Sequence, residues 1–427
     1  MIGIVYGNDN YQIFGEPKAT SDIQSHNIGL SSRSFESKNG PMHPSQIINE
    51  LAEDRELYFN AVSPPIVQTS NFAFKDFASL RGAFDDEMST YLYSRGINPT
   101  VDILRQKLAA LDEAEDCLVL NSGASAIFCA VMSNVQAGDH IISVHKPYTW
   151  AWKLFDNILP RYAVTTTYVD GTRIENFEAA IQPNTKVIYL ESPNTLTFEL
   201  QDLEAVAKLA KSKGIVTIID NSYCTPLFQK PHRFGIDLCL QSATKYIGGH
   251  SDTVGGVLTG SKAMIKQIFD REALNTGAFI SPFNGWLLLR GLRTLPIRLK
   301  HISESTQKVL AFLKSHPKIE KVFFPFDPDF QQYELAQKQM TGACGLLTIA
   351  LKAESYEQME AFAKSLKHFL LAVSWGGHES LIMPKCAGLR PEEFDAANQE
   401  HRLIRLYIGL EEAEYLMEDL EQALAGL

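Results

Sequence analysis

Short apolar segments alternate with amphipathic ones through the middle of the chain, from about residue 100 to residue 260. The apolar segments are rich in valine, isoleucine and leucine and lack polar alternation, which predicts strands buried on both faces of a mostly parallel sheet. The expected strands are 116–120, 140–144, 164–169, 186–190, 215–220 and 236–241. The segments between them predict helices at 124–135, 150–159, 174–181 and 202–213. Such alternation is typical of an α/β domain.

The pattern changes after about Ser281. A long helical stretch is expected at 284–313, and helices near 356–370 and 412–425 follow it. Strands are expected at 319–324, 345–351, 381–383 and 403–408. This mixture predicts a smaller C-terminal α+β domain over residues 281–427, after a large domain at 87–280.

The N-terminal part of the chain has a different character. Residues 1–42 are polar and irregular, which predicts a poorly ordered extension. Residues 43–86 combine a short helix, 44–54, with an extended segment at 64–69 and lack a core of their own. We expect residues 43–86 to form an arm against a neighbouring subunit.

Composition narrows the class of protein. The 427 residues carry a formal net charge of -11, which argues against a surface for nucleic acid or anionic membrane. No apolar run approaches the roughly 20 residues of a membrane-spanning helix, and the N-terminus lacks a signal-peptide pattern. The six cysteines lack CxxC spacing, and the spacing of His and Cys predicts no metal site. We therefore expect a cytoplasmic protein with reduced thiols.

Lys245 is the residue most indicative of chemistry. It follows an expected strand and lies between Ser242 and Thr244, with Gly248 and Gly249 shortly after it. An amine in this position suits a covalently held aldehyde cofactor, and the two hydroxyls suit its phosphate. Because most lysines are solvated surface charges, the hypothesis depends on matching groups elsewhere.

Two of those groups lie at the ends of expected strands. Gly123 and Ala124 open a helix, where small residues let backbone N–H groups approach a phosphate, although a turn without ligand has the same appearance. Asp220 ends an apolar strand, 25 residues before Lys245 (245 minus 220), and would keep a pyridine nitrogen protonated. The alternative for Asp220 is a turn or helix cap.

Other candidates could bind ring, phosphate or substrate. Tyr148 could stack on a cofactor ring, and Tyr93 with Arg95 could bind a phosphate, although packing or an exposed loop would also explain them. Arg405 lies in an apolar strand, where it needs an anion such as a substrate carboxylate or an internal ion-pair partner. Ser374 lies in the same C-terminal domain.

Several motifs in order give the chain a family resemblance. They are Tyr93-Ser94-Arg95, Asn98-Pro99-Thr100, Glu191-Ser192-Pro193, Asp220-Asn221, Ser242-Ala243-Thr244-Lys245, Arg290 to Leu295, Glu379-Ser380-Leu381 and Arg405. With these motifs the chain resembles the Cys/Met-metabolism family of pyridoxal-phosphate enzymes, which includes cystathionine γ-synthase, cystathionine lyases, methionine γ-lyase and O-acylhomoserine sulfhydrylases. The resemblance implies the fold-type I, aspartate-aminotransferase-like fold and a homotetramer, a dimer of dimers with shared active sites.

The resemblance also implies roles for individual residues. Lys245 would form the Schiff base, Asp220 would pair with the ring nitrogen, and Tyr148 would stack on the ring. The phosphate would be held by Gly123, Ala124, Ser242 and Thr244, and by Tyr93 and Arg95 of a neighbouring subunit. Ser374 and Arg405 would bind the carboxylate of a sulfur-containing amino acid.

Four departures from the family pattern bear on the reaction. Thr195 replaces the usual Asn near the cofactor and substrate, and Trp375 replaces a Leu in the manner of bacterial cystathionine β-lyases. Val373 replaces the Glu of γ-acting cystathionine enzymes, and Trp150 replaces the Cys of methionine γ-lyases. We therefore expect β-elimination of L-cystathionine to homocysteine, pyruvate and ammonia. The alternatives are cystathionine γ-synthase, O-acylhomoserine sulfhydrylase, a cystathionine or methionine γ-lyase and, remotely, a non-catalytic pyridoxal-phosphate-binding protein.

Overall fold

A seven-stranded sheet organises the first part of the computed structural model, which describes residues 42–427. The expected extension at 1–42 lies outside the described residues except for Met42. The strand order is β1-β7-β6-β5-β4-β2-β3. The strands are β1 (Asp116–Leu120), β2 (His140–Val144), β3 (Thr165–Val169), β4 (Thr185–Glu191), β5 (Val216–Asp220), β6 (Leu238–Ser242) and β7 (Gly256–Gly260). All are parallel except β7, which pairs antiparallel with β1 and β6, so the expected mostly parallel sheet is confirmed.

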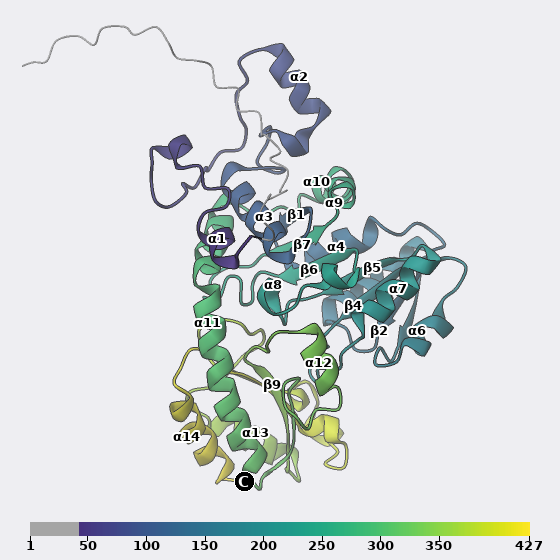
Figure 1. Cartoon of the computed structure of the whole chain (residues 1–427). Helices are drawn as coiled ribbons and strands as arrows, with labels where there is room; N and C mark the ends of the chain where they lie inside the picture. The colour runs from purple at the N-terminus through teal and green to yellow at the C-terminus, as the bar shows by residue number, and fades with distance from the viewer. Residues whose placement is uncertain (1–41) are drawn as a thin grey trace, which may run out of the picture. The chain divides into compact units, whose positions relative to one another are not determined.

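Successive residues of the strands pack into different layers. Ile141, Tyr189 and Ile218 belong to a cluster that includes helix α4 (Gly123–Met132), whereas Ile142 and Ile219 belong to another with α6 (Ile174–Ala180) and α7 (Leu203–Lys213). Helices thus cover both faces of the sheet (Figure 1). One expectation was wrong: β3 is not buried on both faces, because it is the edge strand and only Val169 at its end is buried.

A second sheet, of five strands, lies in the C-terminal part of the chain in the order β10-β11-β12-β9-β8. Its strands are β8 (Ile319–Phe323), β9 (Leu346–Leu351), β10 (Leu370–Leu371), β11 (Leu381–Pro384) and β12 (Leu403–Tyr407). Helices α13 (Tyr356–Ser365) and α14 (Ala413–Leu424) contact one another, and α14 also contacts the long helix α11 (Pro282–Ser315). Figure 1 shows α11 running from the neighbourhood of α3 (Pro99–Asp112) down to α14.

Several expected helices are shorter than predicted, including those expected at 44–54, 124–135, 150–159 and 356–370. The helix expected at 44–54 is α1 (Pro44–Asn49), and Ala52 beyond it has a left-handed φ of 62°. The helix expected at 356–370 ends at Ser365, because Asp419 of α14 accepts hydrogen bonds from the backbone of Lys367 and His368. The chain then continues extended into β10.

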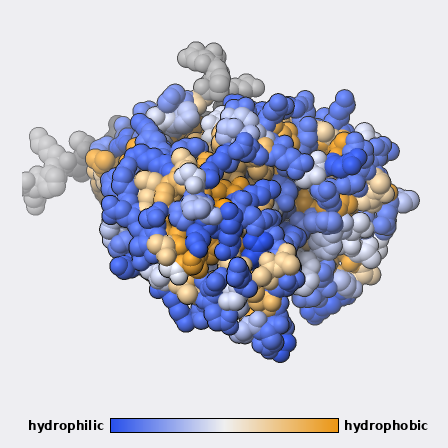
Figure 2. Space-filling model, turned by 90° about the horizontal axis from the view of Figure 1, so that it is seen from below, coloured by the Kyte–Doolittle hydropathy of each residue, from blue (hydrophilic) through white to orange (hydrophobic). Residues whose placement is uncertain are grey.

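The segment before the large sheet combines a packed part and an exposed part. Ile47 and Ile48 of α1 are buried in the core cluster that includes α3. Helix α2 (Phe77–Asp85) exposes 85% of Phe77 and 67% of Phe84. Figure 2 shows that one face of the molecule carries several hydrophobic patches among hydrophilic residues.

The expectations from the sequence about membrane-spanning helices, metal sites and cysteines can be compared with the structure of the described residues. None of the helices within 42–427 is both long and apolar enough to cross a bilayer. No group of three or more potential metal ligands is found in that same range. All six cysteines are free and buried.

Candidate active site

Lys245 lies in the loop that follows β6, at the carboxyl-end edge of the large sheet. Its Nζ donates a hydrogen bond to Ser374 Oγ and lies 5.2 Å from the centre of the Trp375 ring. Burial, and then the nearby Arg405 guanidinium, lower the pKa of the Lys245 amine to about 8, although Asp220 opposes this shift. The amine can therefore lose its proton near neutral pH, as a nucleophile or base must.

Ser374 and Trp375 approach Lys245 because the segment that follows them packs on the lysine backbone. A Cβ on Gly376 would lie 2.7 Å from the Tyr246 nitrogen and 2.9 Å from Lys245 Cα, so only glycine fits there. Ser374 itself has a φ of 78°, a left-handed conformation that is costly for a residue with a side chain. Such strain is often found where a side chain is held for a function.

Arg405 lies in the middle of β12 and is only 9% exposed. Its Nη2 donates to the Ser374 carbonyl over 3.1 Å, but no carboxylate of residues 42–427 forms an ion pair with it. Burial lowers the pKa of the guanidinium to about 10, so it remains charged at neutral pH. A buried cation without an anionic partner, close to a reactive amine, suits the carboxylate of a bound amino acid.

Asp220 ends β5 and is the register partner of Glu191 at the end of β4. The Asp220 carboxylate accepts a hydrogen bond from the Ser222 backbone over 2.9 Å and interacts with the Lys245 cation. Tyr148, 41% exposed, lies near both carboxylates, and its pKa is raised by burial and then by Asp220 and Glu191. The structure therefore places both Tyr148 and Lys245 near the Asp220 carboxylate.

Glu191 is a site residue that the sequence analysis missed, although it belongs to a quoted motif. One of its carboxylate oxygens accepts from the Tyr148 backbone N–H over 2.6 Å, and the other accepts from the Thr195 hydroxyl. Thr195, expected to contact substrate, thus bonds to Glu191. The sequence did contain one indication of this role, because Glu191, like Asp220, ends an apolar strand.

The residues expected around a phosphate lie at the start of α4. The Ser122 side chain caps this helix by accepting from the Ser125 backbone, which leaves the N–H groups of Gly123 and Ala124 without intrahelical acceptors. A Cβ on Gly123 would lie only 3.0 Å from Ser242 Cβ, so α4 and the end of β6 are in close contact. Thr244 Oγ1 accepts from the Gly255 backbone over 3.1 Å. Free amides, nearby hydroxyls, an amine and a strand-end carboxylate fit the phosphate, aldehyde and ring nitrogen of pyridoxal phosphate.

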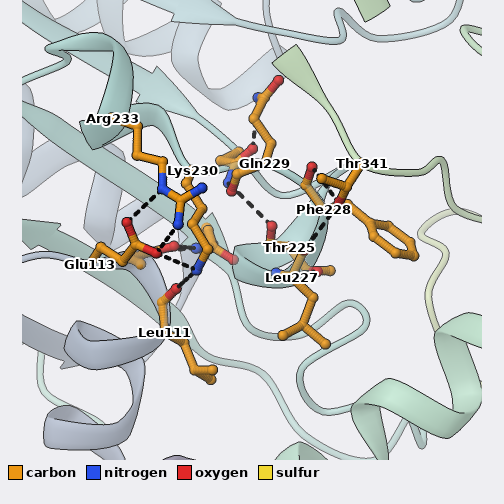
Figure 3. Close-up of polar contacts among 12 residues, drawn as sticks. Leu111, Glu113, Thr225, Leu227, Phe228, Gln229, Lys230, Arg233 and Thr341 are labelled. Carbon is orange, nitrogen blue, oxygen red and sulfur yellow. Dashed lines mark hydrogen bonds and ion pairs between the residues drawn. The ribbon is translucent and has the colours of Figure 1, made fainter. Parts of the chain in front are cut away.

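The segment after Asp220 is fixed by a network that reaches other parts of the fold. Asn221 Nδ2 donates to the Gln229 carbonyl, and Gln229 Nε2 donates to the carbonyl of Ser192, just beyond β4. Farther along, Lys230 donates to the Leu111 carbonyl at the end of α3, and Arg233 binds Glu113 through two hydrogen bonds (Figure 3). These contacts hold the carboxyl ends of β4 and β5 in place.

Tyr93 and Arg95 lie at a different cavity from the one that Trp375 lines. They line a space of about 670 Å³ together with aromatic residues that include Phe72, Phe77 and Phe84. The Arg95 guanidinium lies 5.5 Å from the Tyr93 ring centre, and Tyr93 is 45% exposed. Thr244, Ser374 and Trp375 instead line a cavity of about 560 Å³ with Val373, which is 78% exposed.

Comparisons with known proteins agree on one family. The model of the Cys/Met metabolism PLP-dependent enzymes matches residues 45–425. An L-methionine gamma-lyase of Treponema denticola is 38% identical over 86% of this chain and 94% of its own, and a cystathionine gamma-lyase of Bacillus subtilis is 36% identical over 86% and 95%. The crystal structure of metB from Corynebacterium glutamicum superposes with a TM-score of 0.82 at 31% identity, covering 90% of this chain and 98% of that one.

Proposed function

Because the chain belongs to the Cys/Met metabolism family of PLP-dependent enzymes, we propose that it is a carbon–sulfur lyase that eliminates a thiol from a thioether amino acid. Pyridoxal 5′-phosphate is its cofactor, and when bound it supplies the electron sink for charge that develops at Cα. The observation that carries the proposal is the placement of the Lys245 amine beside a buried guanidinium without a carboxylate partner among residues 42–427.

Different residues of the site would serve different steps of such an elimination. Arg405 and the Ser374 region would bind the substrate carboxylate and so orient the Cα–H bond. Lys245, with its lowered pKa, would hold the cofactor covalently at rest and take the Cα proton during turnover. Asp220 would keep the ring nitrogen protonated, and Gly123, Ala124, Ser242 and Thr244 would hold the phosphate.

We favour γ-elimination from L-methionine, which yields methanethiol, 2-oxobutyrate and ammonia. Relatives at 33–38% identity include several L-methionine gamma-lyases. The cavity that Ser374 and Trp375 line includes the apolar side chains of Val254 and Val373, which could contact an S-methyl group, among polar residues such as Asp252 and Glu379. In γ-elimination Lys245 would act a second time, by removing a proton from Cβ.

β-Elimination of L-cystathionine, the expectation from the sequence, is the second candidate. Trp375 favours it because it matches the pattern of bacterial β-lyases, and Val373 favours it because it lacks the acidic group of the γ-acting cystathionine enzymes. The indole beside the Lys245 amine would also restrict the movement that a second deprotonation at Cβ requires.

The expected quaternary structure belongs to the same proposal. Tyr93 and Arg95 line a cavity separate from the one that Thr244, Ser374 and Trp375 line, which supports a role for them at the phosphate of a neighbouring subunit in a homotetramer. We also retain 43–86 as the contacting arm and 87–280 and 281–427 as the two domains.

The test is a product assay on the purified, cofactor-loaded protein. Incubation with L-methionine should release methanethiol and 2-oxobutyrate in equal amounts. Pyruvate as the main keto acid from L-cystathionine, with no turnover of methionine, would select β-elimination. Condensation of an O-acylhomoserine with a thiol and no keto acid, or no turnover of any of these substrates, would overturn the lyase proposal.

A further inference from the structure

Glu191 and Asp220 place two carboxyl groups side by side at the edge of the sheet where the site lies. They are Cα register partners at the ends of the parallel strands β4 and β5. Glu191 is 6% exposed and forms no ion pair within the described part of the chain. Two adjacent carboxylates in so little water cannot both be ionised without a large electrostatic cost.

The surroundings decide which of the two groups keeps a proton. Burial raises the pKa of Asp220, but its hydrogen bonds with Ser222 and the nearby Lys245 cation favour its charged form, and Glu191 has no such cation. The titratable groups that face Glu191 are Asp220 on β5, Tyr148 before α5 (Thr149–Lys153) and Tyr189 on β4, none of them a cation. Burial, and then Asp220, raise the pKa of Glu191 to about 7.

The hydrogen bonds of Glu191 are compatible with a neutral carboxyl group, although donation from Thr195 and Tyr148 lowers its pKa and only partly offsets the effects of burial and Asp220. One oxygen must accept, because its partner is the Tyr148 backbone N–H at 2.6 Å. The other oxygen bonds to the Thr195 hydroxyl, which can donate to a carboxylate and can equally accept from a protonated carboxyl. The contact with Tyr148 therefore persists when Glu191 carries a proton.

We propose that Glu191 is a positioning residue that holds Tyr148 in the active site in its neutral, protonated form, with Thr195 accepting its proton in a hydrogen bond. In this role Glu191 fixes the start of the Tyr148 segment and leaves Asp220 as the single negative charge of the pair. Thr195, at the position where the family usually has Asn, acts through Glu191. The kinetic part of this inference rests on the proposed function, whereas its structural part does not.

The first experiment compares Glu191→Gln with the parent as cofactor-free proteins between pH 5 and pH 8. A neutral Glu191 in the fold releases its proton at a higher pH than in the unfolded chain, so the parent loses stability as pH rises toward 7. The Gln amide mimics the neutral acid and does not titrate. The melting temperature of the parent should therefore fall relative to that of the variant from pH 5 upward and level off near pH 7, above which Glu191 is ionised in both states. Parallel curves would show that Glu191 is already ionised at pH 5 and would overturn the proposal.

The second experiment tests positioning with the loaded enzyme. Glu191→Ala should lower kcat at least tenfold with little change in KM, and Glu191→Gln should remove the inflection near pH 7 from the kcat/KM profile. Thr195→Val should shift that inflection, and Thr195→Ser, which restores the hydroxyl, should return it. A parent-like kcat in Glu191→Ala would overturn the role of Glu191. If no substrate is turned over, the lyase proposal fails, while the melting curves still decide the protonation state.

Discussion

The two lysines Lys107 and Lys245 show how one side chain serves either structure or chemistry. Lys107 in α3 is fully buried and uses all three of its N–H donors: on the carbonyls of Ile47 and Ile48, each at 2.9 Å, and on the Glu53 carboxylate at 3.0 Å. Lys245 is largely buried too, but its Nζ has one hydrogen bond within the described part, to the Ser374 hydroxyl.

The difference lies in what compensates the cost of burial. Burial lowers the pKa of Lys107, but the hydrogen bond and charge of Glu53 act in the opposite direction, and Arg293 also binds Glu53. At Lys245 the Arg405 cation adds to the effect of burial, and the pKa falls to about 8. A lysine whose donors are all satisfied anchors the chain, whereas an incompletely compensated one is ready to give up its proton.

The largest effect should follow from removing the reactive amine. We expect Lys245→Ala to lower kcat by at least about 10⁴-fold, or about 5.5 kcal/mol of activation free energy, since covalent attachment and proton transfer are both lost. Product formation by the loaded variant measures the effect, and an unchanged circular dichroism spectrum controls for folding. Residual activity above one tenth of the parent would contradict the assignment of Lys245.

Removing the structural lysine should instead act on stability. Lys107→Met removes the fully buried partner of Glu53, which keeps Arg293 at 3.0 Å and Arg55 at 3.5 Å, and leaves the carbonyls of Ile47 and Ile48 without their donor; we expect a loss of about 3–5 kcal/mol in the free energy of unfolding. Urea denaturation measures it. A matched control is Lys308→Met, which breaks an exposed pair with Glu414 and should leave the denaturation midpoint nearly unchanged. Equal midpoints for the two variants would show that burial does not distinguish these pairs.

The different outcomes of the sequence analysis have physical reasons. Asp220 and Lys245 could be identified because local patterns, apolar strands with a polar residue at the end, place them at a known edge of the sheet. Strand β7 was missed because its glycines suggest a turn, yet a Cβ on Gly256 would lie 2.1 Å from the Ser122 carbonyl oxygen. That close approach depends on a partner distant in sequence.

The partners of the buried charged residues could also not be predicted from the sequence. Glu191 meets Asp220 only through the register of β4 on β5, and Lys107 meets Glu53 only because α1 packs on α3. The sequence shows each residue type but not the pairing. Whether a buried lysine is compensated, the property that separates Lys107 from Lys245, therefore has to come from the structure.

The smallest of the three effects concerns the pH dependence of stability in the cofactor-free protein. The pKa of Lys245 is about 8 in the folded state and about 10.4 in an unfolded chain, so the unfolded state binds more protons between these values. The parent should therefore gain stability as pH rises from 8 to 10.4. Lys245→Met lacks this titration and should be more stable than the parent by about 2–3 kcal/mol at pH 7, with the advantage shrinking toward pH 10.4. Urea denaturation at several pH values checks this, and a constant difference between the two proteins would mean that the Lys245 amine is as well compensated as that of Lys107.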